Sequence, residues 1–296
     1  MISSSRAVTL MLLGSLAMAS SAALISFIDA EPMSTAAWRC LLAVPMLAPF
    51  MLWELRRVDR AQALPARTLL GAAVGGIAIG IDYSFYNTSI LLIGAGIATV
   101  LINIQIIVLP LFSWVFEGVR PPARLAVIVP LMMLGVALTA GAFGEAVLSW
   151  AGVLAGLAAG ACYAIYLAII RRTAPPTLRP APFTVLSIVC LCAGLTTLTG
   201  ATATGRLEVP ETVISWGWFL ALAFIGQVVV YLCFNIAMTA LPETVASALM
   251  LTGPIFAVGL GVLLFSEIPS LWQLLGCALI IAGAWWAATA RRRRPS

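Results

Sequence analysis

Charged residues are scarce in this chain: they make up 9% of its 296 residues, whereas about a quarter of an ordinary soluble domain is charged. Histidine and lysine are absent, so every basic residue is an arginine. Their absence excludes Ser/His/Asp triads, histidine metal ligands and lysine Schiff bases. We therefore expect no enzyme, no catalytic residue, no cofactor and no metal site.

Apolar residues are abundant instead, at 62% of the chain. A helix needs about 20 apolar residues to cross a bilayer, so the fold class expected is an all-α membrane protein with ten transmembrane helices. The expected spans lie near Ala7–Ile28, Thr35–Trp53, Thr68–Thr88, Gly94–Phe116, Leu125–Ala142, Trp150–Ile170, Pro182–Thr202, Trp216–Thr239, Glu243–Phe265 and Ser270–Thr289.

The arginines predict how the chain lies in the membrane, because positive charge near span ends is retained in the cytoplasm. If the N-terminus is cytoplasmic, only Arg206 falls in an outside loop. This asymmetry predicts an inner (plasma) membrane protein with both termini cytoplasmic, and it explains the net charge of +5 without a nucleic-acid partner. The first span, with Ala17 and Ala19, also resembles a cleaved signal peptide, but its removal would scramble the arginine distribution.

All six cysteines lie in apolar runs without the spacing of metal ligands. Cys190 and Cys192 are two residues apart and would point to different faces of a helix. We expect the cysteines to be small buried hydrophobic residues rather than disulfides or ligands.

The two halves of the chain can be laid over each other. Phe85-Tyr86-Asn87 precedes Glu117 in the first half, and Cys233-Phe234-Asn235 precedes Glu267 in the second, with Asn to Glu separations of 117 − 87 = 30 and 267 − 235 = 32. With five spans in each copy, the second copy must enter the membrane in the opposite orientation. Such inverted repeats are typical of transporters that hold a substrate near the membrane midplane.

The turns between spans three and four and between eight and nine are short, and SWVFEG and LLFSEI close spans four and nine with a glutamate. Together with GLAAGACYAIYLAIIRR, these features resemble the EamA-type members of the drug/metabolite transporter superfamily. The resemblance implies two inverted five-helix repeats, expected here at 1–146 and 147–296. It also implies transport of small metabolites, often export of amino acids or related compounds.

Two ionisable residues lie clearly inside expected spans, where a charge costs about 2.5 to 3.5 kcal/mol on insertion scales. Arg39 is expected about one turn inside the second span, and Asp82 about one to two turns from the end of the third. At this similar depth they could form a structural ion pair. Alternatively, Arg39 would bind a carboxylate and Asp82 would be the candidate for proton coupling.

Further polar residues share helix faces, such as Gln227, Tyr231 and Asn235 at intervals of four residues. Each alone is adequately explained by a hydrogen bond between helices. Their recurrence on equivalent helices of both copies favours a shared substrate site. The substrate-binding candidates are Arg39, Asp82, Tyr83, Tyr86, Asn87, Asn103, Tyr163, Tyr166, Gln227, Tyr231 and Asn235.

Helix breakers and small residues have separate expected roles. Pro110 interrupts span four, and Gly253 with Pro254 interrupts span nine, which makes these residues hinge candidates or simple kinks. The glycine pairs of span three, Gly71 with Gly75 and Gly76 with Gly80, are expected to let neighbouring helices approach closely.

These features predict a secondary transporter that exports small amphipathic metabolites, amino acids or related compounds, by alternating access, either proton-coupled or by exchange. No phosphate-binding loop is possible without lysine, so the chain cannot hydrolyse ATP. The alternatives are a flippase or multidrug exporter for lipid-linked or drug-like substrates, and a channel. The expected partners are a small-molecule substrate and the lipid bilayer, and the chain would act as a monomer or homodimer.

Overall fold

The computed structural model is helical throughout the residues that it describes, none of which lies in a strand. The described residues are 3–25, 27–28, 30–57, 64–93, 98, 101–102, 104–105, 108, 112, 114–115, 118, 123, 125–139, 149–173, 182–238, 240–241, 243–250, 252–265 and 270–289. The helices are α1 (Ser4–Ile25), α2 (Pro32–Arg57), α3 (Ala66–Ile93), α6 (Leu125–Thr139), α7 (Trp150–Thr173), α8 (Pro182–Ala203), α9 (Val213–Ala223), the π-helical η2 (Phe224–Val229), α10 (Val230–Met238), α11 (Glu243–Met250), α12 (Gly253–Phe265) and α13 (Leu271–Thr289).

Six described helices are long and apolar enough to cross a membrane, and they correspond to expected spans one to three and six to eight. The eighth is one continuous crossing, Val213–Met238, formed by α9, η2 and α10. The fifth and tenth expected spans contain shorter apolar stretches, Ala126–Leu138 and Leu271–Gly283. Span nine is divided between α11 and α12, and most of span four lies outside the described residues. The predicted count of ten therefore stays a prediction.

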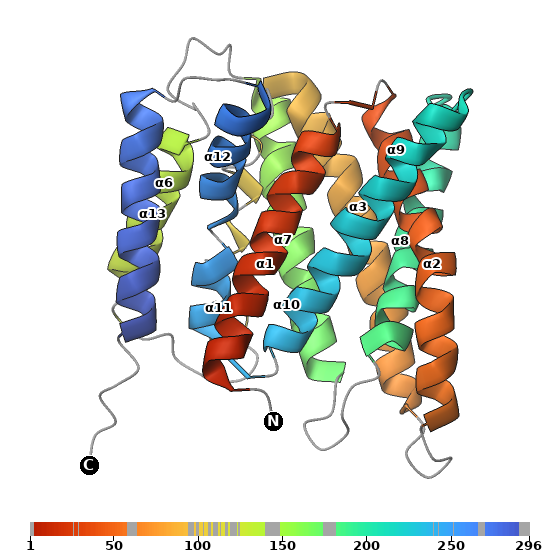
Figure 1. The fold of residues 1–296 in the computed structure, drawn as a ribbon, viewed down its shortest axis with the longest axis horizontal. Helices are drawn as coiled ribbons and strands as arrows, with labels where there is room; N and C mark the ends of the chain where they lie inside the picture. Colours follow the sequence, from red (N-terminus) through yellow and green to blue (C-terminus); the bar gives the residue numbers. More distant parts are fainter. Residues whose placement is uncertain are drawn as a thin grey trace.

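The first helices of the two halves run in opposite directions. In Figure 1, α1 begins at the same end of the bundle at which α7 ends, and α13 also ends there. Hydrogen bonds fix the direction of α7 against α3, since Thr68 bonds to Thr173 and Ser89 bonds to Gly152. The helices therefore have the opposed directions that an inverted repeat requires. The predicted boundary after residue 146 lies outside the described residues.

Helix contacts between the two halves come in equivalent pairs. The third helix of each half packs against the first helix of the other, as α3 does on α7 and α10 does on α1. The second helices, α2 and α8, pack on each other, and so do the last helices, α6 and α13. Two-fold related repeats predict this pattern. It places α3, α7 and α10 around the middle of the molecule, where the polar candidates lie.

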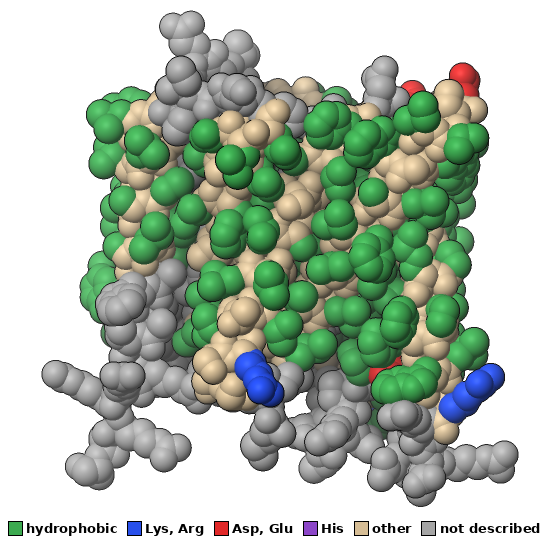
Figure 2. Space-filling model, viewed as in Figure 1, with side chains coloured by type: hydrophobic (Ala, Val, Ile, Leu, Met, Phe, Trp, Pro, Cys, Tyr) green, Lys and Arg blue, Asp and Glu red, His purple; other side chains and the backbone are tan. Residues whose placement is uncertain are grey.

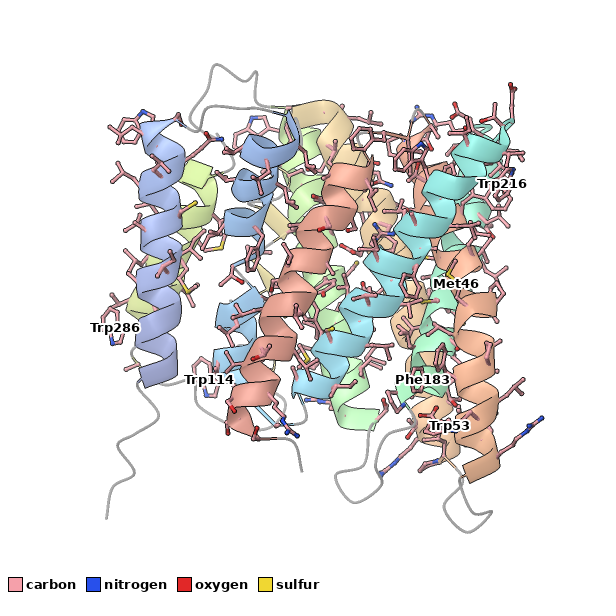
Figure 3. The ribbon with its side chains drawn as sticks, in the orientation of Figure 1. Met46, Trp53, Trp114, Phe183, Trp216 and Trp286 are labelled. Carbon is pink, nitrogen blue, oxygen red and sulfur yellow. The ribbon has the colours of Figure 1, made fainter. Side chains whose placement is uncertain are left out.

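The surface has the character expected of a membrane protein. Figure 2 shows apolar side chains over most of the height of one face, with arginine side chains at one end. Acidic side chains are visible at the opposite end and at one place near the arginine end. Figure 3 places Trp53 and Trp114 toward the end at which α1 begins, and Trp216 toward the opposite end. Tryptophan rings favour the two membrane interfaces, as expected for these residues. The chain is a multi-pass membrane protein.

Helix α3 packs closely between α7 and α8 because its glycines carry no Cβ. A Cβ at Gly71 would meet Thr173 of α7 at 2.3 Å, and one at Gly76 would meet the Val189 carbonyl oxygen of α8 at 2.6 Å. Side chains at these positions would push the helices apart. The packing role predicted for Gly71 and Gly76 agrees with these contacts.

We expect Gly76→Ala to lower the stability of the folded protein. The new methyl group would overlap the backbone of α8, and overpacking of this kind costs about 1–3 kcal/mol. The melting temperature in detergent measures the effect. Gly217→Ala is the matched control, since a Cβ there meets nothing within 4 Å and Ala favours a helix. Equal melting temperatures for both variants would contradict the close packing of α3.

Hydrogen bonds link helices α2 and α8 at both ends of the pair. At one end the buried Glu54 carboxylate accepts hydrogen bonds from the Thr184 backbone N–H and hydroxyl, both at 2.8 Å. At the other end the Ser34 hydroxyl donates to the Arg206 carbonyl oxygen at 2.8 Å and accepts from the Glu208 N–H at 2.9 Å. The two helices therefore form an antiparallel pair beside α3 that is hydrogen-bonded at both ends.

Candidate functional site

The centre of the site is the side chain of Gln227, which is 2% exposed in the interior of the bundle. Its Nε2 lies 2.8 Å from the sulfur of Cys40 on α2 and 3.2 Å from the hydroxyl of Tyr83 on α3. The Tyr83 hydroxyl also lies 3.2 Å from that of Tyr231 on α10. The Gln227 Oε1 is buried and has no hydrogen-bond partner in the described part of the chain. This network joins residues of both halves.

Two tyrosines of α7 extend the network. The ring of Tyr166 lies edge-on to that of Tyr231, with centroids 6.4 Å apart, and the ring of Tyr163 lies 5.8 Å from Tyr166. Tyr83, Tyr163, Tyr166 and Tyr231 are four of the five tyrosines in the chain, and all four are buried. We refer to these four residues as the tyrosine cluster. The structure brings these four predicted residues together, and their role in substrate binding stays a prediction.

Arg39 supplies the positive charge of the site. Its guanidinium carbon lies 4.3 Å from the centroid of the Tyr83 ring, which is a cation–π contact. The Arg39 Nε is buried and has no hydrogen-bond partner among the described residues. Helix α2 begins at Pro32 rather than Thr35, so Arg39 lies about two turns inside it, deeper than predicted.

Asp82 lies on α3 beside Tyr83 and is 1% exposed. The structure contains no ion pair between the described side chains of Arg39 and Asp82, so the predicted pairing is not formed. Successive residues of a helix point about 100° apart, and Arg39 contacts Tyr83 rather than Asp82. The Asp82 Oδ1 has no hydrogen-bond partner within the described residues. Because α3 continues to Ile93, Asp82 lies about three turns from its end, also deeper than predicted.

A π-helical segment carries Gln227. Residues Phe224–Val229 form η2 in the middle of the Val213–Met238 crossing. A Cβ at Gly226, beside Gln227, would lie 2.9 Å from the Cβ of Ser21, so η2 packs directly on α1. Single π turns within α-helices are frequent at functional sites because they change the direction of the side chains around them. The sequence reasoning assumed a regular helix and missed this segment.

Cys40 is the second feature that the sequence reasoning missed. It is buried, as predicted, but its sulfur is a hydrogen-bond partner of Gln227 rather than a purely apolar contact. Its position next to Arg39 was the signal that could have placed it in the site.

Other predicted site residues lie elsewhere or cannot be placed. The Asn87 Nδ2 donates to the Pro32 carbonyl oxygen at 2.9 Å, so this amide ties α3 to the start of α2 instead of joining the tyrosine cluster. Tyr86 is half-buried on α3, and its part in the site stays a prediction. Asn103, Pro110 and the side chains of Asn235 and Pro254 lie outside the described residues.

The predicted interruption at Gly253 is present among the described residues, since α11 ends at Met250 and α12 begins at Gly253. The Leu249 carbonyl oxygen beside the break accepts hydrogen bonds from the hydroxyls of Ser15, at 3.2 Å, and Thr252, at 2.7 Å. Broken helices are tolerated in membranes when side chains satisfy the freed backbone groups in this way. The hinge role of Gly253 stays a prediction.

The arrangement combines three kinds of recognition within one buried site. A guanidinium can bind a carboxylate, a buried carboxylate can bind a cation, and aromatic faces can hold either an apolar group or a cation. Unpartnered polar atoms on Arg39, Asp82 and Gln227 are costly in a protein interior unless a ligand satisfies them. The described part of the chain contains no group of three or more Cys, Asp or Glu residues that could hold a metal ion.

The model of the EamA-like transporter family matches residues 5–141 and again residues 150–289. The chain belongs to this family. A solved structure described as "Crystal structure of protein" is 20% identical, covers 97% of this chain and 98% of its own, and superimposes with a TM-score of 0.76. At that identity the likeness shows a shared fold alone. No curated protein matches the chain. The EamA-like chain is therefore a membrane transporter of the drug/metabolite type.

Proposed function

We propose that this EamA-like chain exports small amphipathic metabolites, amino acids or their close relatives, as a secondary transporter. The observation that carries the proposal is the convergence of the tyrosine cluster with Arg39 and Gln227 in the interior of the bundle. Arg39 would bind the substrate carboxylate, Gln227 would accept a hydrogen bond from the substrate, and the rings would cover its apolar part.

The network supports alternating access because its hydrogen bonds cross between helix groups. Arg39, Cys40 and Tyr83 lie on α2 and α3, which are packed with α8. Gln227 and Tyr231 lie on η2 and α10, which are packed on α1. A rocking motion between these groups would break the bonds of Gln227 to Cys40 and Tyr83 on one side of a bound substrate. Substrate binding would then compensate for the bonds that are lost.

The proposed orientation follows from the charges. Figure 2 shows arginine side chains at the end of the bundle at which α1 begins, where Arg6 of α1 and the end of α2 lie. The Glu31 N–H donates to the Glu208 carboxylate just before the start of α2, at the opposite end. Cytoplasmic retention of arginine makes the first end cytoplasmic, in the inner (plasma) membrane. Export would then carry the substrate from the α1-start end to the end where α2 begins.

Efflux of a radiolabelled amino-acid and metabolite panel from cells that overproduce the protein tests this function. We expect Gln227→Ala to reduce efflux of the transported compound by about tenfold, since one lost hydrogen bond to a buried polar group costs about 1–3 kcal/mol. Gln273→Ala is the matched control, because the Gln273 side chain accepts a hydrogen bond from Ser270 at the exposed start of α13. Equal efflux from the wild type and Gln227→Ala would contradict the placement of the substrate.

A further inference from the structure

The six described helices that are long and apolar enough to cross a membrane contain two acidic residues, Glu54 and Asp82. Both are buried, yet their surroundings differ completely. The Glu54 carboxylate is satisfied by two hydrogen bonds from Thr184, so it has a structural role at the start of α8. The Asp82 Oδ1 has no hydrogen-bond partner among the described residues. A buried acceptor without a partner is costly, and the described residues offer the Asp82 Oδ1 no hydrogen bond to offset that cost.

The position of Asp82 on α3 is fixed by its neighbours. Gly75, Asp82 and Ser89 are spaced by seven residues, which is close to two helical turns, so they share one face of α3. A Cβ at Gly75 would lie 3.2 Å from Tyr166 of α7, and the Ser89 hydroxyl donates to the Gly152 carbonyl oxygen of α7 at 2.8 Å. Asp82 therefore faces α7, while the adjacent Tyr83 faces Arg39 and Gln227.

Few ionisable groups surround this carboxylate. Cys162 and Tyr163 of α7, Tyr83 of α3 and Arg39 of α2 interact with it electrostatically. From α8, Cys192 lies against Gly76, and residues 94–116 contain no ionisable side chain. Asp82 is thus the single acid among the described residues of the site, and it borders the tyrosine cluster through Tyr83 and Tyr163.

We propose that Asp82 binds either a proton or the cationic group of the substrate, so that the transporter exchanges an exported ammonium-bearing substrate for an entering proton. This inference rests on the proposed function and adds its energy source. A carboxylate among aromatic rings is a site for an ammonium ion, and its own proton satisfies the same oxygen. Because protonation removes the negative charge that attracts an ammonium ion, each ligand displaces the other.

The sign of the coupling follows from this competition. On the outside, a high proton concentration protonates Asp82 and releases the substrate. On the cytoplasmic side, loss of the proton restores the carboxylate and the substrate binds again. If the proton instead helped a substrate carboxylate to bind at Arg39, the two would move in the same direction. The direction of the coupling therefore distinguishes the Asp82 site from the Arg39 site.

The test uses the full chain reconstituted in liposomes that contain a radiolabelled mixture of the protein amino acids. We expect efflux into acidic medium to exceed efflux into medium of the internal pH by about fivefold or more, the range of ordinary coupling between sites. A sodium gradient at equal pH should have no effect. In Asp82→Asn the response to acid should disappear. Exchange against unlabelled external amino acids should continue at a reduced rate, because Arg39 and the tyrosine cluster still bind the substrate while its ammonium group has lost the carboxylate. Glu54→Gln, which keeps an acceptor for Thr184, should respond like the wild type.

Each other outcome decides against a specific claim. An unchanged acid response in Asp82→Asn would overturn the role of Asp82 while leaving the transport function intact. Slower efflux into acidic medium would overturn the exchange mechanism. Amino-acid exchange in Asp82→Asn at the wild-type rate would overturn the claim that Asp82 binds the ammonium group. Absence of any flux or exchange in the wild type would contradict the proposed function itself.

A chemical probe tests Asp82 without a substitution. Apolar carbodiimides react with protonated carboxyl groups in the membrane, and mass spectrometry locates the product. We expect modification of Asp82 to fall as the pH of the medium rises and to fall at constant pH when the amino-acid mixture is added. Modification that is unaffected by the mixture would contradict the competition.

Discussion

Replacement of Arg39 by Gln should strongly reduce transport while leaving the protein folded. Truncation of a buried charge contact costs about 2–5 kcal/mol, so we expect transport efficiency to fall about 30-fold or more. The physical reason is that Arg39 is the single positive charge among the described contacts of the tyrosine cluster, and its Nε has no partner within the described residues. Initial rates in inside-out membrane vesicles, over a range of substrate concentrations, give the effect on KM.

Arg39→Lys separates the role of charge from that of shape. The guanidinium lies over the Tyr83 ring, 4.3 Å from its centroid. Its planar shape suits both stacking on the ring and bidentate hydrogen bonding to a carboxylate. Lysine keeps the charge but loses the planar group, so we expect only partial recovery of transport. Arg206→Gln is the control, because Arg206 is exposed in the loop after α8. Transport with normal KM in Arg39→Gln would contradict substrate binding at this residue.

The sequence predicted the composition of the site better than its internal contacts. Apolar runs located the helices that carry Arg39, Tyr83, Tyr163 and Tyr231, and polar residues within such runs must face the protein interior. Convergence of these residues followed from the repeat, because equivalent helices of two related halves meet at one axis. Asn87 shows the limit of the argument, since it points to the start of α2 instead.

The contacts that were missed depend on how helices are rotated and how far they extend. The absence of an ion pair between Arg39 and Asp82 results from the direction of Asp82 toward α7. Residue depth alone cannot give that direction. The η2 segment adds a local change of helix geometry, and the sequence around Gln227 contains no residue that demands it. Cys40 was predicted to be a buried hydrophobic residue because it lies in an apolar run. Such a run does not reveal the hydrogen bond between Cys40 and Gln227.

The second large effect expected is on stability, from Glu54→Ala. Removal of the carboxylate leaves the Thr184 N–H and hydroxyl without their acceptor at the start of α8. Hydrogen bonds to charged groups contribute about 1.5–3 kcal/mol each, so we expect a loss of about 2–4 kcal/mol. A change of this size lowers the melting temperature of a protein of this length by roughly 5–10 °C. Thermal unfolding in detergent measures it.

Glu54→Gln identifies the cause of that loss. Its amide oxygen can still accept from Thr184, but without a full negative charge, so we expect it to lose about half as much stability as Glu54→Ala.

Glu208→Ala is a useful comparison at the other end of the α2 and α8 pair. The Glu208 backbone makes the contacts with Ser34 and Trp38, whereas its exposed carboxylate accepts only from the Glu31 N–H among the described contacts. Surface contacts of this type contribute little, so Glu208→Ala should melt near the wild type. If Glu54→Ala also melted near the wild type, the pairing of α2 and α8 would not depend on this carboxylate. Other helices would then have to form the part of the structure that stays fixed during the rocking motion.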